Sequence, residues 1–455
     1  MEWKKALRDL LPDEQISENP TILEHHSKDE SYHQPVKPDI VVFPKSKIEI
    51  SEIMKIAYKY KIPVVPFGAG SSLEGHPIPV SGGISMDFQF MNHIIEVREK
   101  DLLIKVQPGV TRKQLNKALK KYGLFFPVDP GADATIGGMT STNASGTTTV
   151  KYGAMKDVVR GLEVVLANGE IVNLGGLAAK SSSGYNLTPL FVGSEGTLGV
   201  FTEITLKVFG IPEATLACRA VFPSVDHAIN AANAMVSAGI PIARIELVDA
   251  RSMKQVNVHN GTLYPEQPTL FMEFHGNEEG IKADVKFAKE LADLEGCCQF
   301  EYETDSLKKA KLWEARHTLA YAFKHGYPAK KNMSTDVCVP LSKLPDAISH
   351  ASMLLETYGL VGGIVGHVGD GNFHALIMID PKDHVESDMA HTVNQKIVEF
   401  AIECGGTATG EHGIGLGKID YLYKEHASSI HLMKMIKDQF DPLGILNPGK
   451  MFKSQ

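Results

Sequence analysis

The sequence predicts an α+β fold, and three observations support that prediction. The chain has 455 residues, which is enough for two or three domains with well-developed cores. From residue 40 onward, segments with the apolar pattern of strands are interspersed with segments of helical periodicity. After Pro212 these segments follow the order β-α-β-β-α-β, which is typical of a ferredoxin-like sheet. We therefore expect a ferredoxin-like core in the second half of the chain.

The individual elements are predicted from periodicity and from Gly, Pro and Asn punctuation. Helical segments are expected over 1–34, joined by Pro12 and Pro20, and a hairpin is expected over 94–107 and another around the turn Ala167-Asn-Gly-Glu170. Strands are predicted at 40–43, 63–66, 84–86, 204–208, 214–221, 243–248, 269–274 and 299–302, and helices at 47–59, 111–122, 224–238, 278–294, 306–325 and 428–440.

Composition excludes several classes of protein. A net charge of −8 disfavours nonspecific binding to nucleic acid. The chain has no apolar run of 18 residues, and its charged, amphipathic N-terminus lacks the apolar core of a signal peptide. We therefore expect a cytoplasmic protein, with peripheral association through a membrane-facing surface patch left open. Five scattered cysteines without a Cys-x2-Cys pair predict neither a disulfide framework nor an iron–sulfur site.

The first glycine-rich segment, Phe67-Gly-Ala-Gly-Ser-Ser-Leu-Glu-Gly75, follows a predicted strand. Its spacing is close to the dinucleotide fingerprint, but Pro77 and Pro79 break the helix that the fingerprint requires. What remains is a loop of small residues whose consecutive backbone N–H groups can bind phosphate. The alternative is an ordinary tight turn.

Two further segments of small residues lie at 130–146 and 193–200. Ile136, Met139 and Asn143 recur at helical spacing, so Gly137-Gly138 would begin a short helix whose N–H groups favour a pyrophosphate. A flexible linker is the alternative for 130–146, although a linker would be more charged. One ligand that touches all three segments would explain their composition.

The segment His367-Val-Gly-Asp-Gly-Asn-Phe-His374 predicts a hairpin with Asp370-Gly371 as a two-residue turn. In that register His367 faces His374, with their Cβ atoms roughly 4.5–5.5 Å apart, close enough for one metal ion. About forty residues on, Thr407-Ala-Thr-Gly-Glu-His-Gly-Ile-Gly415 offers Glu411 as a third ligand and His412 as a base. Two His and one Glu leave a metal open to substrate. The alternative is a glycine-rich hairpin with a surface His pair and an unrelated carboxylate.

Arg316 is predicted to lie on an apolar helical stripe with Trp313 and Phe323. An unpaired charge among apolar neighbours is costly, so a carboxylate partner is implied, because a guanidinium binds carboxylates with two parallel hydrogen bonds. The alternative is that Arg316 extends to solvent or to Glu314.

Six motifs then carry a family resemblance: PFGAGSSLEG, PGADATIGGMTSTNASGT, FVGSEGTLGVFTEITLKV, HVGDGNFH, TGEHGIG and ILNPGK. Their order resembles that of the FAD-linked D-2-hydroxyacid dehydrogenases, above all the cytochrome-type D-lactate dehydrogenases and the glycolate oxidase catalytic subunit. The resemblance implies an N-terminal helical segment at 1–34, a two-subdomain FAD-binding domain of the PCMH/VAO type at 35–212, and a substrate domain with a ferredoxin-like core and helical additions at 213–455.

The resemblance also implies the site. Its metal ligands would be His367, His374 and Glu411 for zinc or manganese, its base His412, and its binder of the substrate carboxylate Arg316. Because Gly70-Ser71-Ser72 contains no His for covalent attachment, FAD is expected to be non-covalent, with His76 as the nearby exception to test. The residues implied to contact FAD are Pro66, Gly68, Ala69, Gly70, Ser71, Ser72, Gly75, Pro130, Gly131, Gly137, Gly138, Thr140, Asn143, Ser145, Gly146, Glu195, Val200 and Asn447.

The implied activity is oxidation of a 2-hydroxy acid with hydride transfer to FAD. Leu376 occupies a place where the 2-hydroxyglutarate branch usually carries Asn, which favours D-lactate first and glycolate second. D-2-hydroxyglutarate and a non-catalytic FAD-binding homologue stay open, as do a homodimer and the partner subunits of a glycolate oxidase. The electron acceptor is expected to be a quinone, a cytochrome or an electron-transfer flavoprotein.

Overall fold

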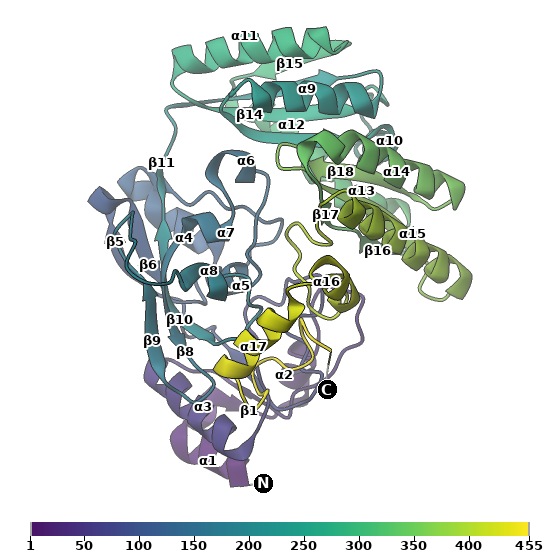
Figure 1. Cartoon of the computed structure of the whole chain (residues 1–455). Coiled ribbons are helices and arrows are strands. Elements are labelled where there is room, and N and C mark those ends of the chain that lie inside the picture. The colour runs from purple at the N-terminus through teal and green to yellow at the C-terminus, as the bar shows by residue number, and fades with distance from the viewer. Residues whose placement is uncertain (1, 454–455) are drawn as a thin grey trace. The chain divides into compact units, whose positions relative to one another are not determined.

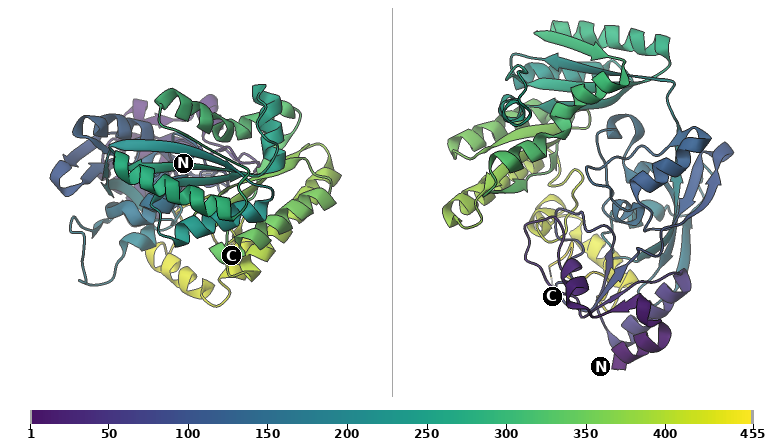
Figure 2. Two further views of the ribbon diagram at one scale, coloured as in Figure 1. Left: turned by 90° about the horizontal axis from the view of Figure 1, so that it is seen from above. Right: turned by 180° about the vertical axis from the view of Figure 1, so that it is seen from behind.

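A computed structural model describes residues 2–453, apart from the side chain of Ala320. The chain forms two compact units, shown in Figures 1 and 2. Unit 1 contains Met1–Gly146, Gly153–Ile211 and Glu411–Gln455, and unit 2 contains Thr147–Tyr152 and Pro212–Gly410. The predicted boundary after residue 212 therefore lies one residue from the boundary at 211/212.

Unit 1 begins with a small, mostly parallel sheet. Its order is β1 (Ile16–Ser17), β2 (Ile40–Val42), β4 (Ile84–Asp87) and β3 (Val64–Phe67), and β2, β4 and β3 run parallel. Helix α3 (Lys47–Tyr60) connects β2 to β3 and packs against α1 (Glu2–Leu10), while α2 (Pro20–His25) leads into β2. Buried Ile50, Ile53 and Met54 of α3 form a core with Trp3 of α1.

The second sheet of unit 1 is antiparallel. Its order is β5 (Ile94–Arg98), β6 (Leu103–Val106), β10 (Val200–Lys207), β8 (Val159–Val165) and β9 (Ile171–Gly175). Gly169 has φ +85° in the turn between β8 and β9, as the predicted hairpin requires. Accessory elements are α4 (Arg112–Leu119), β7 (Leu124–Phe125) paired with β11 (Phe209–Gly210), α5 (Ile136–Ser141), α7 (Met155–Val158) and α8 (Thr188–Phe191).

The end of the chain returns to unit 1. After α16 (Ile419–Glu425) and α17 (Ile430–Phe440), Leu446 forms a parallel bridge with Val64 and is fully buried in the core of the parallel sheet. Figure 1 and the right view of Figure 2 show this yellow tail beside purple segments of the same unit. Residues 411–455 thus group with unit 1, whose core contains buried Ile445 and Leu446, and the expected domain 213–455 stays a prediction.

Unit 2 is built on one large sheet. Its order is β15 (Gln299–Glu303), β12 (Ala214–Val221), β14 (Thr269–Gly276), β13 (Ile242–Val248), β18 (Gly362–His367), β19 (Asn372–Ile379) and β16 (Lys331–Ser334), with β17 (Val337–Cys338) also on β19. The first four strands lie in the order fourth, first, third and second along the chain. That order confirms the predicted ferredoxin-like core, which a second hairpin extends.

The helices of unit 2 form two groups. Helices α9 (Val225–Ser237) and α11 (Glu278–Leu294) pack together against β12, β13 and β14, and α14 (Leu344–Thr357) packs against α9 and α15 (His384–Glu403). A separate cluster joins α10 (Ala250–Asn260), α12 (Ser306–His317) and α13 (Leu319–Gly326) to the sheet through residues such as Trp313, Phe323 and Phe271.

One helix prediction was wrong, and one helix was not predicted. The single helix expected over 306–325 is two helices that meet at Thr318, whose hydroxyl donates to the Glu314 carbonyl at 2.8 Å. Helix α10 was not predicted, although Asp249 caps it by accepting from the Ser252 amide.

Residues 147–152 belong to unit 2, although the residues on both sides of them belong to unit 1, and they contain α6 (Thr149–Tyr152). The Tyr152 hydroxyl lies 2.9 Å from Nδ1 of His275, and Lys151 Nζ donates to the His275 carbonyl at 2.6 Å. Burial raises the pKa of Tyr152 to about 12. The sequence did not indicate that residues 147–152 belong to unit 2.

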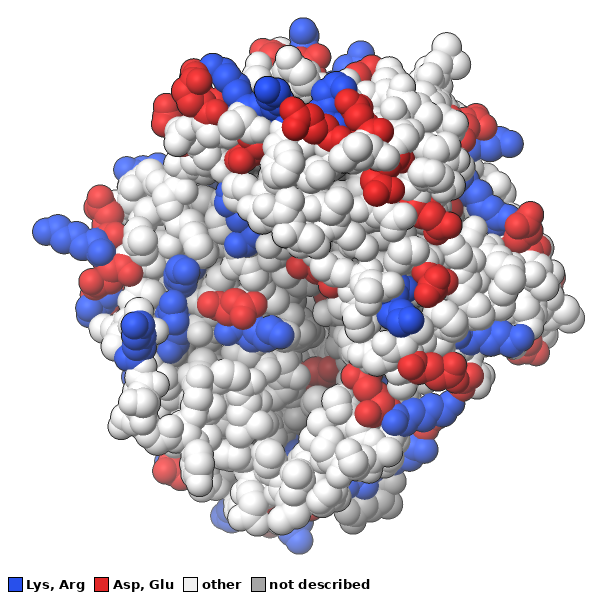
Figure 3. Space-filling view, turned by 45° about the horizontal axis from the view of Figure 1, so that its top comes forward, with Lys and Arg blue, Asp and Glu red and all other residues white. Residues whose placement is uncertain are grey.

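Charge is mixed over the surface shown in Figure 3, where Lys and Arg side chains alternate with Asp and Glu. Among the described residues, no helix combines the length and apolar character needed to cross a bilayer.

Candidate active site

The two histidines of the HVGDGNFH motif share one face of the β18–β19 hairpin. The register pairs His367 with Asn372 and Val365 with His374, so the connection has four residues and the predicted two-residue turn is wrong. Only Gly371 of the pair Asp370-Gly371 has a positive φ, whereas a type I′ turn needs both. The register differs from the expected one by two residues, and an even shift keeps both imidazoles on the same face. Their ring centroids lie 5.5 Å apart.

Each of these imidazoles is held through Nδ1. His367 Nδ1 lies 2.6 Å from a carboxylate oxygen of Glu246, and His374 Nδ1 lies 3.0 Å from the carbonyl oxygen of Thr335. Both partners are acceptors, so in the neutral rings Nδ1 carries the proton and Nε2 carries the lone pair. The ligating atoms of the two rings lie within 4.8 Å of each other. This donor set fits a divalent metal, because metal-binding histidines are commonly oriented by such a second hydrogen bond.

Glu246 of β13 is the residue that sequence reasoning missed. Its side chain is fully buried, and its second oxygen accepts from Nε of Arg316 at 2.9 Å and lies 2.8 Å from Nη2 of the same guanidinium. Burial opposes ionisation, but the charges of His367 and Arg316 outweigh it and lower the pKa of Glu246. A charged residue in the middle of the apolar strand Ile242–Val248 was the available signal.

Arg316 has the surroundings that its sequence position predicted. Trp313 and Phe323 are each 3% exposed, and the Arg316 side chain is 17% exposed. The implied carboxylate partner exists, and it is Glu246 rather than solvent or Glu314. Nε and Nη2 of Arg316 thus both face one oxygen of Glu246.

A second buried carboxylate, Asp336, orders the far side of the hairpin. Its oxygens accept from Asn372 Nδ2 at 2.9 Å and from Thr409 Oγ1 at 2.7 Å. Gly410 packs so closely here that a Cβ atom would lie 2.2 Å from Asn372 Nδ2. The chain is thus fixed against Asp336 and Asn372 up to the residue that immediately precedes Glu411.

In unit 1, Glu411 is tied to the second small-residue segment. Ser145 Oγ donates to the Glu411 carboxylate at 2.8 Å, and Glu411 and the neighbouring His412 are both partly exposed. Ser145 was expected to contact FAD, so this bond connects a predicted FAD segment to the predicted metal ligand.

Glycines of the first two small-residue segments are closely packed against neighbouring parts of unit 1. A Cβ at Gly68 would lie 2.4 Å from Thr135 Oγ1, one at Gly137 would lie 2.6 Å from Pro108 Cβ, and one at Gly146 would lie 2.5 Å from the Asp129 carbonyl oxygen. The Gly137 amide donates to the Pro108 carbonyl, and the Gly138 amide donates to Thr135 Oγ1. Close packing therefore accounts for part of the composition that the sequence attributed to a ligand.

The first segment also has an anchor that the sequence did not reveal. Asp29 accepts from Ser72 Oγ at 2.6 Å and from the Gly75 amide at 2.8 Å, and Gly70 has φ +64°. Near it, a Cβ at Gly196 would lie 3.1 Å from Pro66.

The remaining predicted FAD contacts lie in these same segments. The Gly193 amide donates to the Thr140 carbonyl, Asn143 has φ +50° and accepts from the Lys156 amide, and Val200 begins β10. The structure thus brings the three small-residue segments together within unit 1, and the FAD contacts of all the named residues, Ala69, Ser71, Pro130 and Gly131 included, stay predictions.

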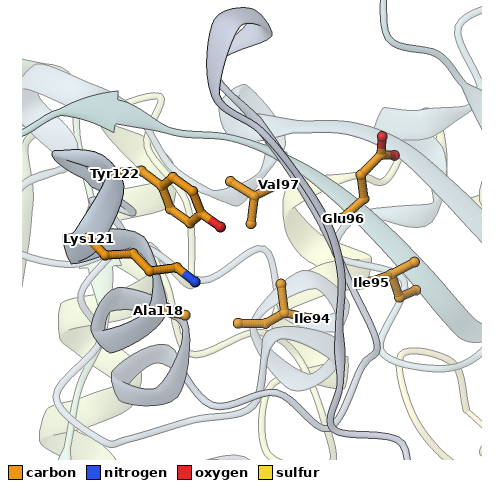
Figure 4. Close-up of a pocket in the computed structure, with 7 residues that line it drawn as sticks. All are labelled: Ile94, Ile95, Glu96, Val97, Ala118, Lys121 and Tyr122. Carbon is orange, nitrogen blue, oxygen red and sulfur yellow. The ribbon is translucent and has the colours of Figure 1, made fainter.

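A hollow of about 410 Å³ also lies in unit 1, between β5 and the end of α4 (Figure 4). None of the predicted site residues lines it, so it is separate from the candidate active site. Its walls are Ile94, Ile95, Glu96, Val97, Ala118, Lys121 and Tyr122.

Comparison with known families agrees with this geometry. Residues 38–175 match the family described as "FAD binding domain", and residues 211–451 match "FAD linked oxidases, C-terminal domain". The chain belongs to the FAD-linked oxidase family. The FAD-binding match covers the first two small-residue segments, and the C-terminal match covers Arg316, both hairpin histidines and Glu411-His412.

Relatives of this FAD-linked oxidase include enzymes for two small acids. It is 42% identical over 98% of its length to "Probable D-lactate dehydrogenase, mitochondrial" of Danio rerio, covering 91% of that protein. It is 40% identical over 97% of its length to "D-lactate dehydrogenase [cytochrome], mitochondrial" of Arabidopsis thaliana, covering 80% of that protein. It is 36% identical over 91% of its length to "Glycolate oxidase subunit GlcD" of Bacillus subtilis, covering 89% of that protein.

Solved structures confirm the fold class. The 4-ethylphenol oxidase from Gulosibacter chungangensis superposes with a TM-score of 0.81 at 19% identity, covering 99% of this chain and 96% of that one. An alkyldihydroxyacetonephosphate synthase superposes with a TM-score of 0.78 at 20% identity, covering 98% of this chain and 85% of that one. The PCMH/VAO-type α+β prediction is therefore confirmed.

Proposed function

We propose that this FAD-linked oxidase is a dehydrogenase of a small D-2-hydroxy acid, with D-lactate to pyruvate as the favoured reaction. The observation that carries the proposal is the buried Glu246 carboxylate. One of its oxygens lies against Nδ1 of His367, a proposed metal ligand, and the other accepts from Arg316. A 2-hydroxy acid has the matching pair of groups: a hydroxyl that a metal can polarise and a carboxylate that a guanidinium can hold.

The proposed metal ligands are His367, His374 and Glu411, with zinc or manganese as the metal. The Nδ1 bonds of the two imidazoles support the first two assignments. Glu411 is supported by its place in the chain, because it directly follows Gly410, which is packed against Asn372. When bound, the metal would act as a Lewis acid on the substrate hydroxyl, and FAD would accept the hydride.

The chain's own residues would then orient the substrate and move its proton. Arg316 would hold the substrate carboxylate, which fixes the hand of the α-carbon that the site accepts. His412 would take the hydroxyl proton as general base, and a neutral imidazole is suited to that step near neutral pH. Glu246 would keep Arg316 and His367 in place while the proton moves.

The environment of Leu376 supports a small monoacid. Leu376 follows His374 on the same face of β19, and it belongs to a hydrophobic cluster with Trp313, Phe323 and Val365. A second carboxylate, as in 2-hydroxyglutarate, would lose its hydration next to these apolar side chains. D-Lactate is therefore favoured, glycolate is second and D-2-hydroxyglutarate is third.

The glycolate alternative carries further proposals. A catalytic subunit of that type would act with partner subunits, whereas a D-lactate dehydrogenase would act alone or as a homodimer. FAD is proposed to be non-covalent, and the electron acceptor to be a quinone, a cytochrome or an electron-transfer flavoprotein. Cytoplasmic residence, with peripheral membrane association as an addition, also stays a prediction.

Rapid mixing of the purified protein with D-lactate, glycolate and D-2-hydroxyglutarate tests the proposal. We expect the flavin absorbance to bleach fastest with D-lactate and to stop bleaching after chelation. Bleaching only with added partner chains would favour the glycolate oxidase type. No bleaching with any of the three acids, in a protein loaded with FAD and metal, would contradict the proposed function.

A further inference from the structure

Glu195 has a backbone conformation that normally favours glycine. Its φ is +53°, and it lies between Gly193 and Gly196, whose φ angles are +83° and +70°. A Cβ-bearing residue at positive φ is strained, and such strain persists where the surrounding structure fixes it. The Glu195 side chain is also buried, with the residue 4% exposed. A carboxylate at this position therefore calls for a reason beyond the turn itself.

The carboxylate binds the segment that carries Glu411 and His412. One oxygen accepts from the Ile414 amide at 2.6 Å, and the other accepts from the Gly415 amide at 2.9 Å. Gly413 presses so closely that a Cβ atom would lie 2.9 Å from a Glu195 oxygen. The residues directly after the predicted metal ligand and base are thus held by Glu195.

The same carboxylate faces His76, which follows the first small-residue segment. His76 Nε2 lies 3.3 Å from Glu195 Oε2, and both residues are buried. Burial opposes both charges, but their mutual attraction outweighs it, so the pKa of His76 is raised and that of Glu195 is lowered. The two backbone amides lower the pKa of Glu195 further.

The backbone of Glu195 reaches the other predicted FAD segments. Its amide donates to the Ser141 carbonyl at 2.8 Å, and its carbonyl accepts from Asn447 Nδ2 at 2.8 Å. Asn447 Nδ2 also donates to the His76 carbonyl at 3.1 Å. Through this one residue, the second and third small-residue segments, His76 at the end of the first, and the C-terminal tail are connected to residues 414–415.

A second ion pair strengthens the same connection. Lys418 Nζ lies 3.3 Å from Glu74, and both side chains are 7% exposed. The Leu416 amide donates to the Glu74 carbonyl at 2.8 Å. The segment 414–418 is therefore attached at several points to the loop that contains Glu74 and His76.

We propose that Glu195 is a positioning residue that couples FAD binding to metal binding, by transmitting the order of the FAD segments to Glu411 and His412. The inference rests on the proposed function, since it takes FAD and a divalent metal as the two ligands. Coupling of this kind is reciprocal: if FAD improves the metal affinity by some factor, the metal improves the FAD affinity by the same factor.

The test measures the FAD dissociation constant of the full-length protein with Zn²⁺ and after chelation. For the wild type we expect FAD to bind at least about fivefold more tightly with Zn²⁺, at the lower end of typical allosteric coupling. Glu195→Gln replaces one acceptor oxygen by an NH₂ group. The ratio of the FAD dissociation constant after chelation to that with Zn²⁺ should therefore fall to near one. Glu170→Gln, on an exposed turn of the same unit, should keep the wild-type ratio.

Two further measurements cover a variant that does not fold. Glu195→Asp keeps the charge but is one methylene shorter and cannot reach both amides, so its ratio should also fall to near one. In the wild type, hydrogen exchange at the Ile414 and Gly415 amides should be slower with FAD bound than after FAD removal.

The proposal would be overturned by a wild-type ratio of one or by a wild-type ratio that stays unchanged in Glu195→Gln. It would also be overturned if hydrogen exchange at the Ile414 and Gly415 amides is the same with and without FAD. These readouts use no hydroxy acid. If FAD and Zn²⁺ bind cooperatively but no 2-hydroxy acid reduces the flavin, the proposed function fails and the coupling stands. If D-lactate reduces the flavin but the ratio is one, the coupling fails and the function stands.

Discussion

Glu246 and Glu195 are two buried carboxylates with similar chemistry and different supports. Each lies beside a histidine, each has a lowered pKa despite burial, and each holds a second group. Glu246 projects from the regular strand β13, where alternation fixes its direction. Glu195 projects from a glycine-flanked turn at positive φ, where contacts with four segments fix its direction.

The position of Glu246 is therefore fixed by a regular strand, whereas the position of Glu195 depends on the order of the segments around it. A side chain on a central strand keeps its place as long as the sheet is folded. A side chain on a loop keeps its place only while the segments around it are ordered, and binding of a ligand to those segments changes that order. We therefore expect Glu246 to set metal affinity under all conditions and Glu195 to set it in a manner that depends on FAD.

The largest expected effect concerns the end of the loop that Glu195 holds. His412→Ala removes the proposed base without touching the hydrogen bonds of Glu195 to Ile414 and Gly415. Flavin content should stay at the wild-type level, while flavin reduction by D-lactate, followed by stopped flow, should slow by about a thousandfold. His431→Ala, at an exposed position of α17, is the control. Reduction at the wild-type rate would remove His412 from the mechanism.

Glu246→Gln tests whether Glu246 sets metal affinity independently of FAD. The amide can no longer accept from both His367 and Arg316, so metal affinity should fall by roughly ten- to a hundredfold, and the KM for D-lactate should rise as Arg316 loses its partner. Metal titration with and without FAD should show the same loss in both states. Glu356→Gln, exposed at the end of α14, is the matched control. A loss seen only without FAD would contradict the distinction between the two carboxylates.

Leu376→Asn tests whether Leu376 contributes to the choice of substrate. A polar amide in the cluster with Trp313 should lower kcat/KM for D-lactate by about tenfold and improve the ratio for D-2-hydroxyglutarate relative to D-lactate. Leu376→Met keeps volume and polarity, so it should change neither kcat/KM for D-lactate nor the preference between the two acids appreciably. An unchanged preference in Leu376→Asn would separate Leu376 from substrate selection.

The smallest expected effect is a pH dependence near Glu195. Burial lowers the pKa of Lys450 to about 8 from 10.5, with Glu195 and Asp29 opposing the shift. Between these pH values the unfolded chain binds more protons at this site, so the lysine's contribution to the free energy of unfolding rises with pH, by at most about 1.4 kcal/mol per unit.

The melting temperature of the wild type relative to Lys450→Met should therefore increase by about 2 °C from about pH 8 to about pH 10. Lys453→Met, at an exposed position, should show no such trend. A difference that is constant or falls with pH would contradict the assigned shift.

The sequence was most informative where regular structure decides the outcome. Alternation and punctuation located β12 and α11 at their observed bounds, and the order of elements predicted the ferredoxin-like core. The shared face of His367 and His374 was also predictable, because it depends only on the parity of the register.

Long-range partners were not predictable. Glu246 lies 121 residues before His367, and Asp29 lies 43 residues before Ser72, so no local pattern connects either pair. The return of residues 411–455 to unit 1 likewise depends on the burial of Leu446 beside Val64. The hairpin loop, which is longer than expected, also has a long-range partner, because the Val339 amide donates to the Gly371 carbonyl and a Cβ at Gly371 would lie 2.1 Å from the Val339 carbonyl oxygen.

The most direct test of the account is the absorbance spectrum of the metal-loaded protein before and after D-lactate, repeated on His367→Ala. We predict a yellow wild-type protein that bleaches with D-lactate, and a variant that stays yellow, binds less Zn²⁺ and does not bleach. Equal bleaching of both proteins would contradict a reaction that depends on a metal held by the hairpin histidines.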